Sequence, residues 1–208
     1  MLSERFDSAL LFASHLHRDQ TRPGSAVPYV SHLLGVASLV LEDRGSEDEA
    51  IAALLHDAIE DHADRYAGGR DALRADIAAR FGGKVLEIVD ACTDDGDYGN
   101  RGSPAWKELK QRYIGHFTTA NESVRRVACA DKVQNARAIL ADYRQYGESL
   151  WERFRTKSRD DQFWYYGELL RVFQETNTGR LAVELAVTLS LLQATASGSA
   201  GPYFTGAR

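Results

Sequence analysis

Four residues whose side chains can do acid–base or metal chemistry lie together within residues 50–64. They are His56, Asp57, Glu60 and Asp61, and the apolar residues around them recur at helical spacing, which predicts an amphipathic helix. Residues four apart on a helix share a face, so the histidine would lie beside Glu60 and Asp57 beside Asp61. A metal ion held here would have carboxylates about one helical turn away, roughly 5.4 Å. Carboxylates at that distance suit orienting or deprotonating a water that a metal activates.

This stretch alone also fits two ordinary interpretations. A His-Asp dipeptide arises by chance in many proteins, and a helical run of acidic residues is usually a solvated face. Both interpretations stay open until the rest of the chain is considered.

A second candidate lies in residues 122–143, which are apolar on several sides and therefore predicted to be buried. This segment contains Asp131 and Lys132. A lone buried charge is costly, so each of them needs a partner. Asp131 is thus a candidate metal ligand, and Asn135, one turn on, shares its face. The alternative is a simple ion pair between Asp131 and Lys132.

A loop rich in proline, glycine and serine, residues 21–28, leads to Tyr29 and His32 at the start of a predicted helix. Arg22 in this loop, together with free N–H groups at the helix start, can meet an anionic ligand, although a solvated arginine fits equally well. His15 and His17, near the end of the first predicted helix, are interpreted as helix-end or surface residues rather than ligands.

Length and composition indicate one ordinary globular domain. The 208 residues are 44% hydrophobic and 26% charged, and we assign residues 1–195 to a single domain and 196–208 to a disordered tail. The net charge of −5 argues against a nucleic-acid partner. Because there is no long apolar run and no signal-peptide layout, we expect no membrane association and a cytoplasmic location. Cys92 and Cys129 lie in apolar patterns and are predicted to be buried free thiols.

Apolar periodicity predicts an all-α protein, a bundle of about eight to ten helices. The predicted helices cover residues 3–19, 32–43, 50–64, 70–81, 84–93, 104–117, 122–143, 159–175 and 179–194. The last of them is apolar on more than one side, which indicates a buried helix or one that forms a homodimer. Residues 93–103 are polar and rich in glycine and are interpreted as a lid or rim loop.

Taken together, these residues resemble the hydrolase domain of the RelA/SpoT homologues in its stand-alone form, the small alarmone hydrolases, which are HD-domain proteins. The similarity covers about residues 9–143, in the family's order. The motifs that carry it are PYVSH at 28–32, ALLHDAIED at 53–61, FGGKV at 81–85, CTDD at 92–95 and ADKVQNAR at 130–137.

The resemblance implies an HD-domain bundle in which one divalent metal, manganese, is bound by His32, His56, Asp57 and Asp131. It implies that Glu60 and Asp61 act on the attacking water. The implied reaction removes the 3′-pyrophosphate from guanosine tetra- or pentaphosphate and yields GDP or GTP and pyrophosphate. The resemblance further implies a set of substrate-binding residues: Arg22, Tyr29, Asn135, Lys107 and Lys110.

The sequence departs from the family at a few positions. Pro23 follows Arg22 where relatives carry an Arg-Lys pair, His62 stands where many have threonine, and Gln134 where many have histidine or tyrosine. Ligand chemistry alone also fits zinc, iron or cobalt. Two alternatives therefore remain: a phosphohydrolase acting on another nucleotide, such as an adenosine alarmone or NADPH, and a nucleotide sensor without turnover.

Overall fold

The computed structural model describes residues 1–94 and 104–198 and is built from helices, as predicted. Within those residues there is no β-strand, only one isolated bridge between Thr21 and Pro28. The elements are α1 (Glu4–Leu16), α2 (Val30–Glu42), α3 (Glu47–Leu55), α4 (Ala58–His62), α5 (Gly69–Phe81), α6 (Gly83–Cys92), α7 (Pro104–His116), α8 (Glu122–Tyr146), the 3-10 helix η1 (Gly147–Arg153), α9 (Arg159–Glu175) and α10 (Gly179–Ala196).

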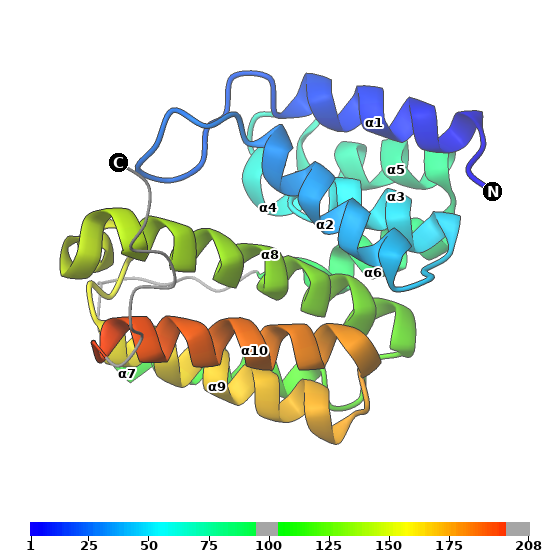
Figure 1. The fold of residues 1–208 in the computed structure, drawn as a ribbon. Coiled ribbons are helices and arrows are strands. Elements are labelled where there is room, and N and C mark those ends of the chain that lie inside the picture. Colours follow the sequence, from blue (N-terminus) through cyan, green and yellow to red (C-terminus); the bar gives the residue numbers. More distant parts are fainter. Residues whose placement is uncertain (95–103, 199–208) are drawn as a thin grey trace, which may run out of the picture.

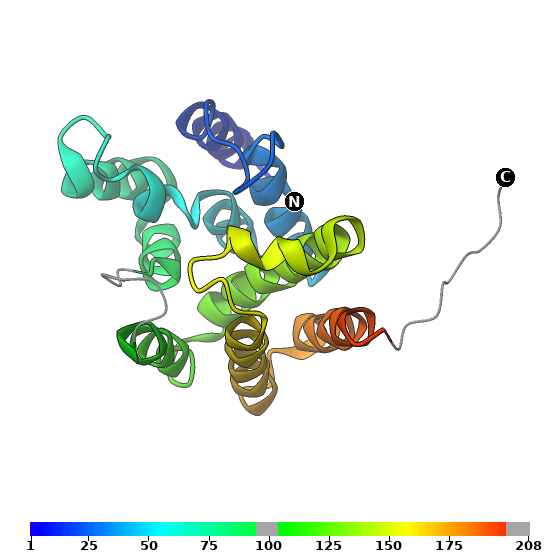
Figure 2. The same ribbon diagram turned by 90° about the vertical axis from the view of Figure 1, so that its left-hand side faces the viewer.

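The long helix α8 runs through the middle of the molecule. Figure 1 shows helices α1 to α6 on one side of it and α7, α9 and α10 on the other, and Figure 2 shows the same division from the end. It packs against α2, α3 and α6 on the first side and against α9 and α10 on the second. Residues of α8 can therefore contribute to the core of both halves and to any site between them.

Helix α3 is the most buried element. It begins at a capping box, in which the Ser46 side chain accepts the N–H of Glu49 and the Glu49 side chain accepts the N–H of Ser46. Every residue from 50 to 55 is fully buried. The Glu49 carboxylate also pairs with Arg126 of α8, which holds Asp43 at the end of α2 as well. This shared arginine joins the three helices that surround the candidate site.

The prediction of one helix over residues 50–64 is wrong at its centre. Helix α3 ends at Leu55 and α4 begins at Ala58, so His56 and Asp57 form a turn between them. In a continuous helix the carbonyl of Ala53 would accept the N–H of Asp57, but here it lies 2.8 Å from Nδ1 of His56. Apolar periodicity does not reveal this break, because the residues on both sides of the turn are buried.

Helix α10 is only partly buried, so the first of its two predicted alternatives, a helix enclosed on every side, is wrong. Leu181, Leu185 and Leu192 are buried, whereas Val183 and Val187 are exposed. No helix in the described ranges 1–94 and 104–198 has the length and apolar character needed to span a membrane. The predicted thiols, Cys92 and Cys129, are both buried and free, which confirms that interpretation. Most of the predicted rim loop and tail lies outside the described residues.

Candidate active site and metal centre

Four side-chain atoms converge at one point between α2, the turn after α3, and α8. We call the residues that carry them, His32, His56, Asp57 and Asp131, the ligand corner. The Nε2 atoms of the two histidines are 3.3 Å apart. His32 Nε2 lies 3.5 Å from Asp57 Oδ2 and 3.2 Å from Asp131 Oδ1. For His56 Nε2 the corresponding distances are 3.0 Å and 3.6 Å.

These spacings fit one metal ion. Nitrogen and oxygen ligands about 2.1 Å from a common ion stand roughly 3.0–3.4 Å apart, depending on whether the geometry is octahedral or tetrahedral. The two histidines and Asp57 also place one ligand atom each within 4.8 Å of one another. Two imidazoles and two carboxylates suit several divalent transition metals. The donor set and its spacing therefore fit a divalent transition metal.

The two imidazoles are held so that the same nitrogen of each points into the corner. His32 Nδ1 lies 2.8 Å from the side-chain oxygen of Gln134, and His56 Nδ1 lies 2.8 Å from the carbonyl of Ala53. Both partners are acceptors, so each histidine carries a proton on Nδ1 and directs Nε2 into the corner. This is the orientation that a metal-binding histidine requires.

Gly35 of α2 makes room for this arrangement. A Cβ atom at Gly35 would lie 2.9 Å from Cγ of Gln134, so a larger residue would push the glutamine away from His32. The glycine therefore lets α2 approach α8 closely enough for the Gln134 amide to reach the imidazole.

The corner concentrates charge in a buried place. Burial would raise the pKa of Asp57 and Asp131, but His56 beside the first and Lys132 beside the second hold both pKa values well below the usual range. Lys132 Nζ lies 2.6 Å from Asp131 Oδ2. Both carboxylates are therefore ionised and able to bind a cation.

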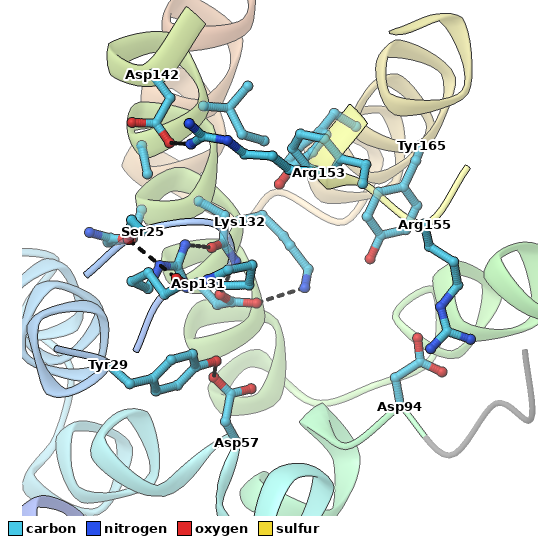
Figure 3. Close-up of a pocket in the computed structure, with 18 of the residues that line it drawn as sticks. Ser25, Tyr29, Asp57, Asp94, Asp131, Lys132, Asp142, Arg153, Arg155 and Tyr165 are labelled. Atoms are coloured by element: carbon cyan, nitrogen blue, oxygen red, sulfur yellow. Dashed lines mark hydrogen bonds and ion pairs between the residues drawn. The ribbon is translucent and has the colours of Figure 1, made fainter. Parts of the chain in front are cut away.

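The corner opens into a cavity of about 550 Å³. Figure 3 shows it with Tyr29 and Asp57 at one end, Asp131 and Lys132 on the helix that crosses it, and Arg153, Arg155 and Tyr165 opposite. We call Lys110, Arg153, Arg155 and Tyr165 the outer wall. The volume is in the range of ligand pockets and suits a nucleotide.

Glu60 lies on the wall of this cavity, whereas Asp61 does not. Enclosure by the cavity and the negative charge of Asp57 raise the pKa of Glu60 to about 7, although its side chain still reaches solvent. Its Oε2 accepts the N–H of Asp94 at 3.1 Å. Asp61 is held instead by Gln20, whose Nε2 donates to Asp61 Oδ2 at 2.7 Å. The two acidic residues of the motif therefore have different surroundings.

Three predicted substrate-binding residues line the cavity: Arg22, Tyr29 and Asn135. Tyr29 and Asn135 contact the corner, and Arg22 reaches it through Asn135. Arg22 donates to Asn135 Oδ1 at 2.6 Å, and Asn135 Nδ2 in turn donates to Asp131 Oδ1 at 2.5 Å. The Tyr29 hydroxyl donates to Asp57 Oδ2 at 2.6 Å. The loop that bears Arg22 is closed by backbone hydrogen bonds, from Arg22 N to the carbonyl of Val27 and from Tyr29 N to Gln20.

The two predicted lysines of α7 separate. Lys110 lines the cavity, where its Nζ lies 2.7 Å from Asp94 and 5.0 Å from the centre of the Tyr165 ring. Lys107 does not line it and pairs with Asp161 on the exposed side. Only the first lysine is placed to meet a ligand in the cavity.

The family model described as "HD domain" matches residues 9–157, which is more than half of the chain. The chain belongs to the HD-domain family.

Relatives of this HD domain carry a common name. The guanosine-3′,5′-bis(diphosphate) 3′-pyrophosphohydrolase MESH1 of Xenopus tropicalis is 29% identical over 83% of this chain and 89% of its own. The MESH1 of Mus musculus is 28% identical over 80% and 83%. A solved structure of a metazoan orthologue of SpoT that hydrolyses ppGpp superposes with a TM-score of 0.71 at 23% identity, covering 91% of this chain and 96% of that one. These relatives confirm the resemblance to stand-alone alarmone hydrolases, and the superposition confirms the fold.

Several cavity residues of this HD domain escaped the sequence reasoning. Lys132 was considered only as an ion-pair partner of Asp131, yet it also lines the cavity. Arg153 and Arg155 lie in η1 and just after it, in a segment to which the sequence analysis assigned no role. Arg153 packs against the Arg22 loop at Gly24, where φ is +71° and a Cβ atom would lie 2.7 Å from the Arg153 side chain. Chain segments that meet only in three dimensions leave no local signal of this kind.

His17 also differs from its prediction as a surface residue. It follows α1, at the expected helix end, but its side chain is only 2% exposed.

Proposed function

We propose that this HD domain is a small alarmone hydrolase: a metal-dependent enzyme that removes the 3′-pyrophosphate of guanosine tetra- or pentaphosphate. The observation that carries the proposal is the position of the ligand corner, at one end of a nucleotide-sized cavity with Glu60 on its wall. The activity named for the MESH1 relatives gives the substrate class. A further support is the mixture of aromatic and cationic side chains around the cavity, which suits a nucleoside joined to phosphates.

We assign His32, His56, Asp57 and Asp131 as the metal-binding residues and manganese as the metal. A divalent ion there would lower the pKa of water and neutralise charge on the phosphate under attack. The protein's own contribution is to direct Nε2 of both imidazoles into the corner, through Gln134 and the Ala53 carbonyl, and to keep Asp131 ionised, through Lys132.

Glu60 is assigned as the general base. A base works best when its pKa lies near the working pH, and the pKa of Glu60 is raised to about 7. It would take a proton from the attacking water while the new P–O bond forms and the bond from phosphorus to the 3′ oxygen breaks, and the 3′ oxygen would take up a proton from solvent to leave GDP with a 3′ hydroxyl. Asp61 is assigned to orient the water, from its place beside the corner.

Cations around the cavity would hold the phosphates. Lys132 and Lys110 flank the Tyr113 ring, with Nζ atoms 5.5 Å and 5.7 Å from its centre. The pyrophosphate is negatively charged before, during and after its transfer to water, and positive side chains fixed beside it would hold it in place. Arg22 can add a bidentate contact once a phosphate replaces Asn135 as its acceptor. Tyr29 and Asn135 would contact the rest of the nucleotide.

The direct test is incubation of the purified, metal-stripped protein with guanosine tetraphosphate, with and without manganese, with the products resolved by ion-exchange chromatography. The proposal predicts GDP and intact pyrophosphate, formed only when metal is added. Release of single phosphates, or no product under conditions in which an adenosine alarmone or NADPH is cleaved, would contradict it.

Three further expectations complete the proposal. We propose that residues 1–195 form one functional domain. A cytoplasmic location and a homodimer that uses the exposed valines of α10 remain predictions. Cell fractionation and analytical ultracentrifugation test them.

A further inference from the structure

A cluster of polar side chains lies next to the ligand corner but outside the cavity lining. Its members are His17 at the end of α1, Gln20 in the following loop, and Asp61 and His62 of α4. The Gln20 side-chain oxygen lies 2.7 Å from His17 Nδ1 and 2.9 Å from His62 Nε2. The Gln20 side-chain nitrogen lies 2.7 Å from Asp61 Oδ2. The glutamine therefore joins two histidines to a carboxylate.

The hydrogen-bonding pattern fixes which histidine nitrogens carry protons. Burial lowers the pKa of both His17 and His62, so both rings are neutral and each has one N–H. A proton on His17 Nε2 would leave an N–H donor buried, since among the described residues that atom has no partner. It would also set two lone pairs against each other, on His17 Nδ1 and the Gln20 oxygen. His62 Nε2 also lies 3.1 Å from His17 Nδ1, but the Gln20 oxygen is nearer to each of the two nitrogens. We therefore place the proton of His17 on Nδ1, where it donates to Gln20.

Two donors on one oxygen leave the amide a single orientation. His62 Nε2 donates to the same Gln20 oxygen, so the NH₂ group of Gln20 must point the other way, toward Asp61. A flipped amide would face the Asp61 carboxylate with its oxygen at 2.7 Å, acceptor against acceptor. Burial and the charge of Asp57 raise the pKa of Asp61, and the Gln20 hydrogen bond counteracts this by favouring the ionised form.

The cluster is also braced against the corner itself. The His17 ring stacks on the ring of Tyr29, with 5.2 Å between centroids and 12° between planes. The hydroxyl of Tyr29 donates to Asp57 Oδ2. A buried histidine with an unpaired nitrogen is a poor choice for stability alone, which points to a role in the site.

We propose that Gln20 is a positioning residue, oriented by His17 and His62, that fixes the Asp61 carboxylate for its part in the reaction. This rests on the proposed function. None of the three residues touches the substrate or the metal, and each acts through Asp61. His62 therefore supplies the second donor that holds the amide.

A double-mutant cycle between Gln20 and Asp61 tests the proposal. We expect Gln20→Met, which keeps the length of the side chain but removes the donor, to lower kcat about 10- to 100-fold, the usual range for outer-sphere partners. KM and the affinity for manganese should stay near those of the wild type. In an Asp61→Asn background the same change should alter kcat less than about twofold, because the group that it positions is already lost. An equal loss in both backgrounds, or no loss in either, would overturn the proposal.

Substitutions of His17 separate positioning from general stability. The amide nitrogen of asparagine can take the place of Nδ1–H, so His17→Asn should retain most of the kcat. The kcat of His17→Leu should instead fall toward that of Gln20→Met. Melting temperatures by circular dichroism identify any variant that is merely unfolded. An equal loss of kcat in both folded variants would count against the role of His17.

A spectroscopic measurement keeps the inference independent of the substrate assignment. Long-range ¹H–¹⁵N NMR at pH 8 reports which nitrogen of each histidine is protonated, and His17→Asn and His62→Thr assign the signals. We expect Nδ1–H on His17 and Nε2–H on His62. Nε2–H on His17 would overturn the inference even if guanosine tetraphosphate is cleaved. If it is not cleaved while the tautomers are as expected, the proposed substrate is wrong and the cluster is tested with the nucleotide that is turned over.

Discussion

The ligand corner and the outer wall line the same cavity but are built in different ways. The corner is drawn from packed helices, and its histidine side chains are 1–2% exposed and fixed by neighbours on both ring nitrogens. The wall comes from α7, η1 and α9, and its cations are already paired: Lys110 with Asp94, and Arg153 with Asp142. The corner side chains already converge on one point, whereas a phosphate at the wall would compete with carboxylates for its cations. This difference indicates that the corner governs the chemistry, while the outer wall governs the choice of substrate.

The largest effect should come from breaking the corner. Asp131→Asn removes one charged ligand and leaves Lys132 without its partner, so we expect manganese binding to be lost and turnover to fall by far more than the roughly 100-fold that an outer-sphere change costs. Isothermal titration with manganese and the GDP assay measure both. Asp76→Asn, at a half-buried pair with Arg80 far from the cavity, is the control. Full activity in the Asp131 variant would remove this residue from the metal site.

Glu60→Gln should have the next largest effect. We expect kcat to fall about 10²- to 10⁴-fold, as for loss of a general base, while manganese still binds. A base must be deprotonated to act, and the pKa of Glu60 is raised to about 7, so wild-type activity should rise with pH up to this region. A bound cation lowers this pKa, which moves the rise to lower pH. The pH profile of kcat in the variant should lack the rise; a profile unchanged in shape would rule out Glu60 as the base.

A smaller effect is expected from the support of His32. Gln134→Leu removes the acceptor at Nδ1 and should weaken manganese binding about 10- to 100-fold without abolishing it. Gln193→Leu, on the exposed face of α10, is the matched control. Unchanged manganese affinity in the Gln134 variant would mean that packing alone orients the imidazole.

The smallest effect should come from the outer wall. Lys110→Ala should raise KM several-fold with little change in kcat, because the lysine would contact the substrate equally in the ground state and in the transition state. Lys107→Ala should change KM less, since this lysine pairs with Asp161 outside the cavity. Steady-state kinetics with guanosine tetraphosphate measure both variants. An equal effect of the two would contradict the placement of α7.

The sequence predicted the helices and the corner better than the wall, for a physical reason. The place of Asp131 beside charged partners could be inferred because a charge in an apolar helix demands a partner, and the His-Asp dipeptide lies in a similarly apolar stretch. The break at His56 was missed because it depends on a side-chain contact with Ala53 rather than on periodicity. Arg153, Arg155 and Gln20 were missed because their roles arise only when distant segments meet.

The most direct test of the account measures manganese occupancy and turnover in the same sample. Metal-stripped protein is titrated with manganese, free metal is followed by electron paramagnetic resonance, and GDP release from guanosine tetraphosphate is measured at each step. The account predicts one tightly bound ion per chain and activity that rises in proportion to its occupancy. Turnover before any metal binds, or saturation of the ion without turnover, would contradict it.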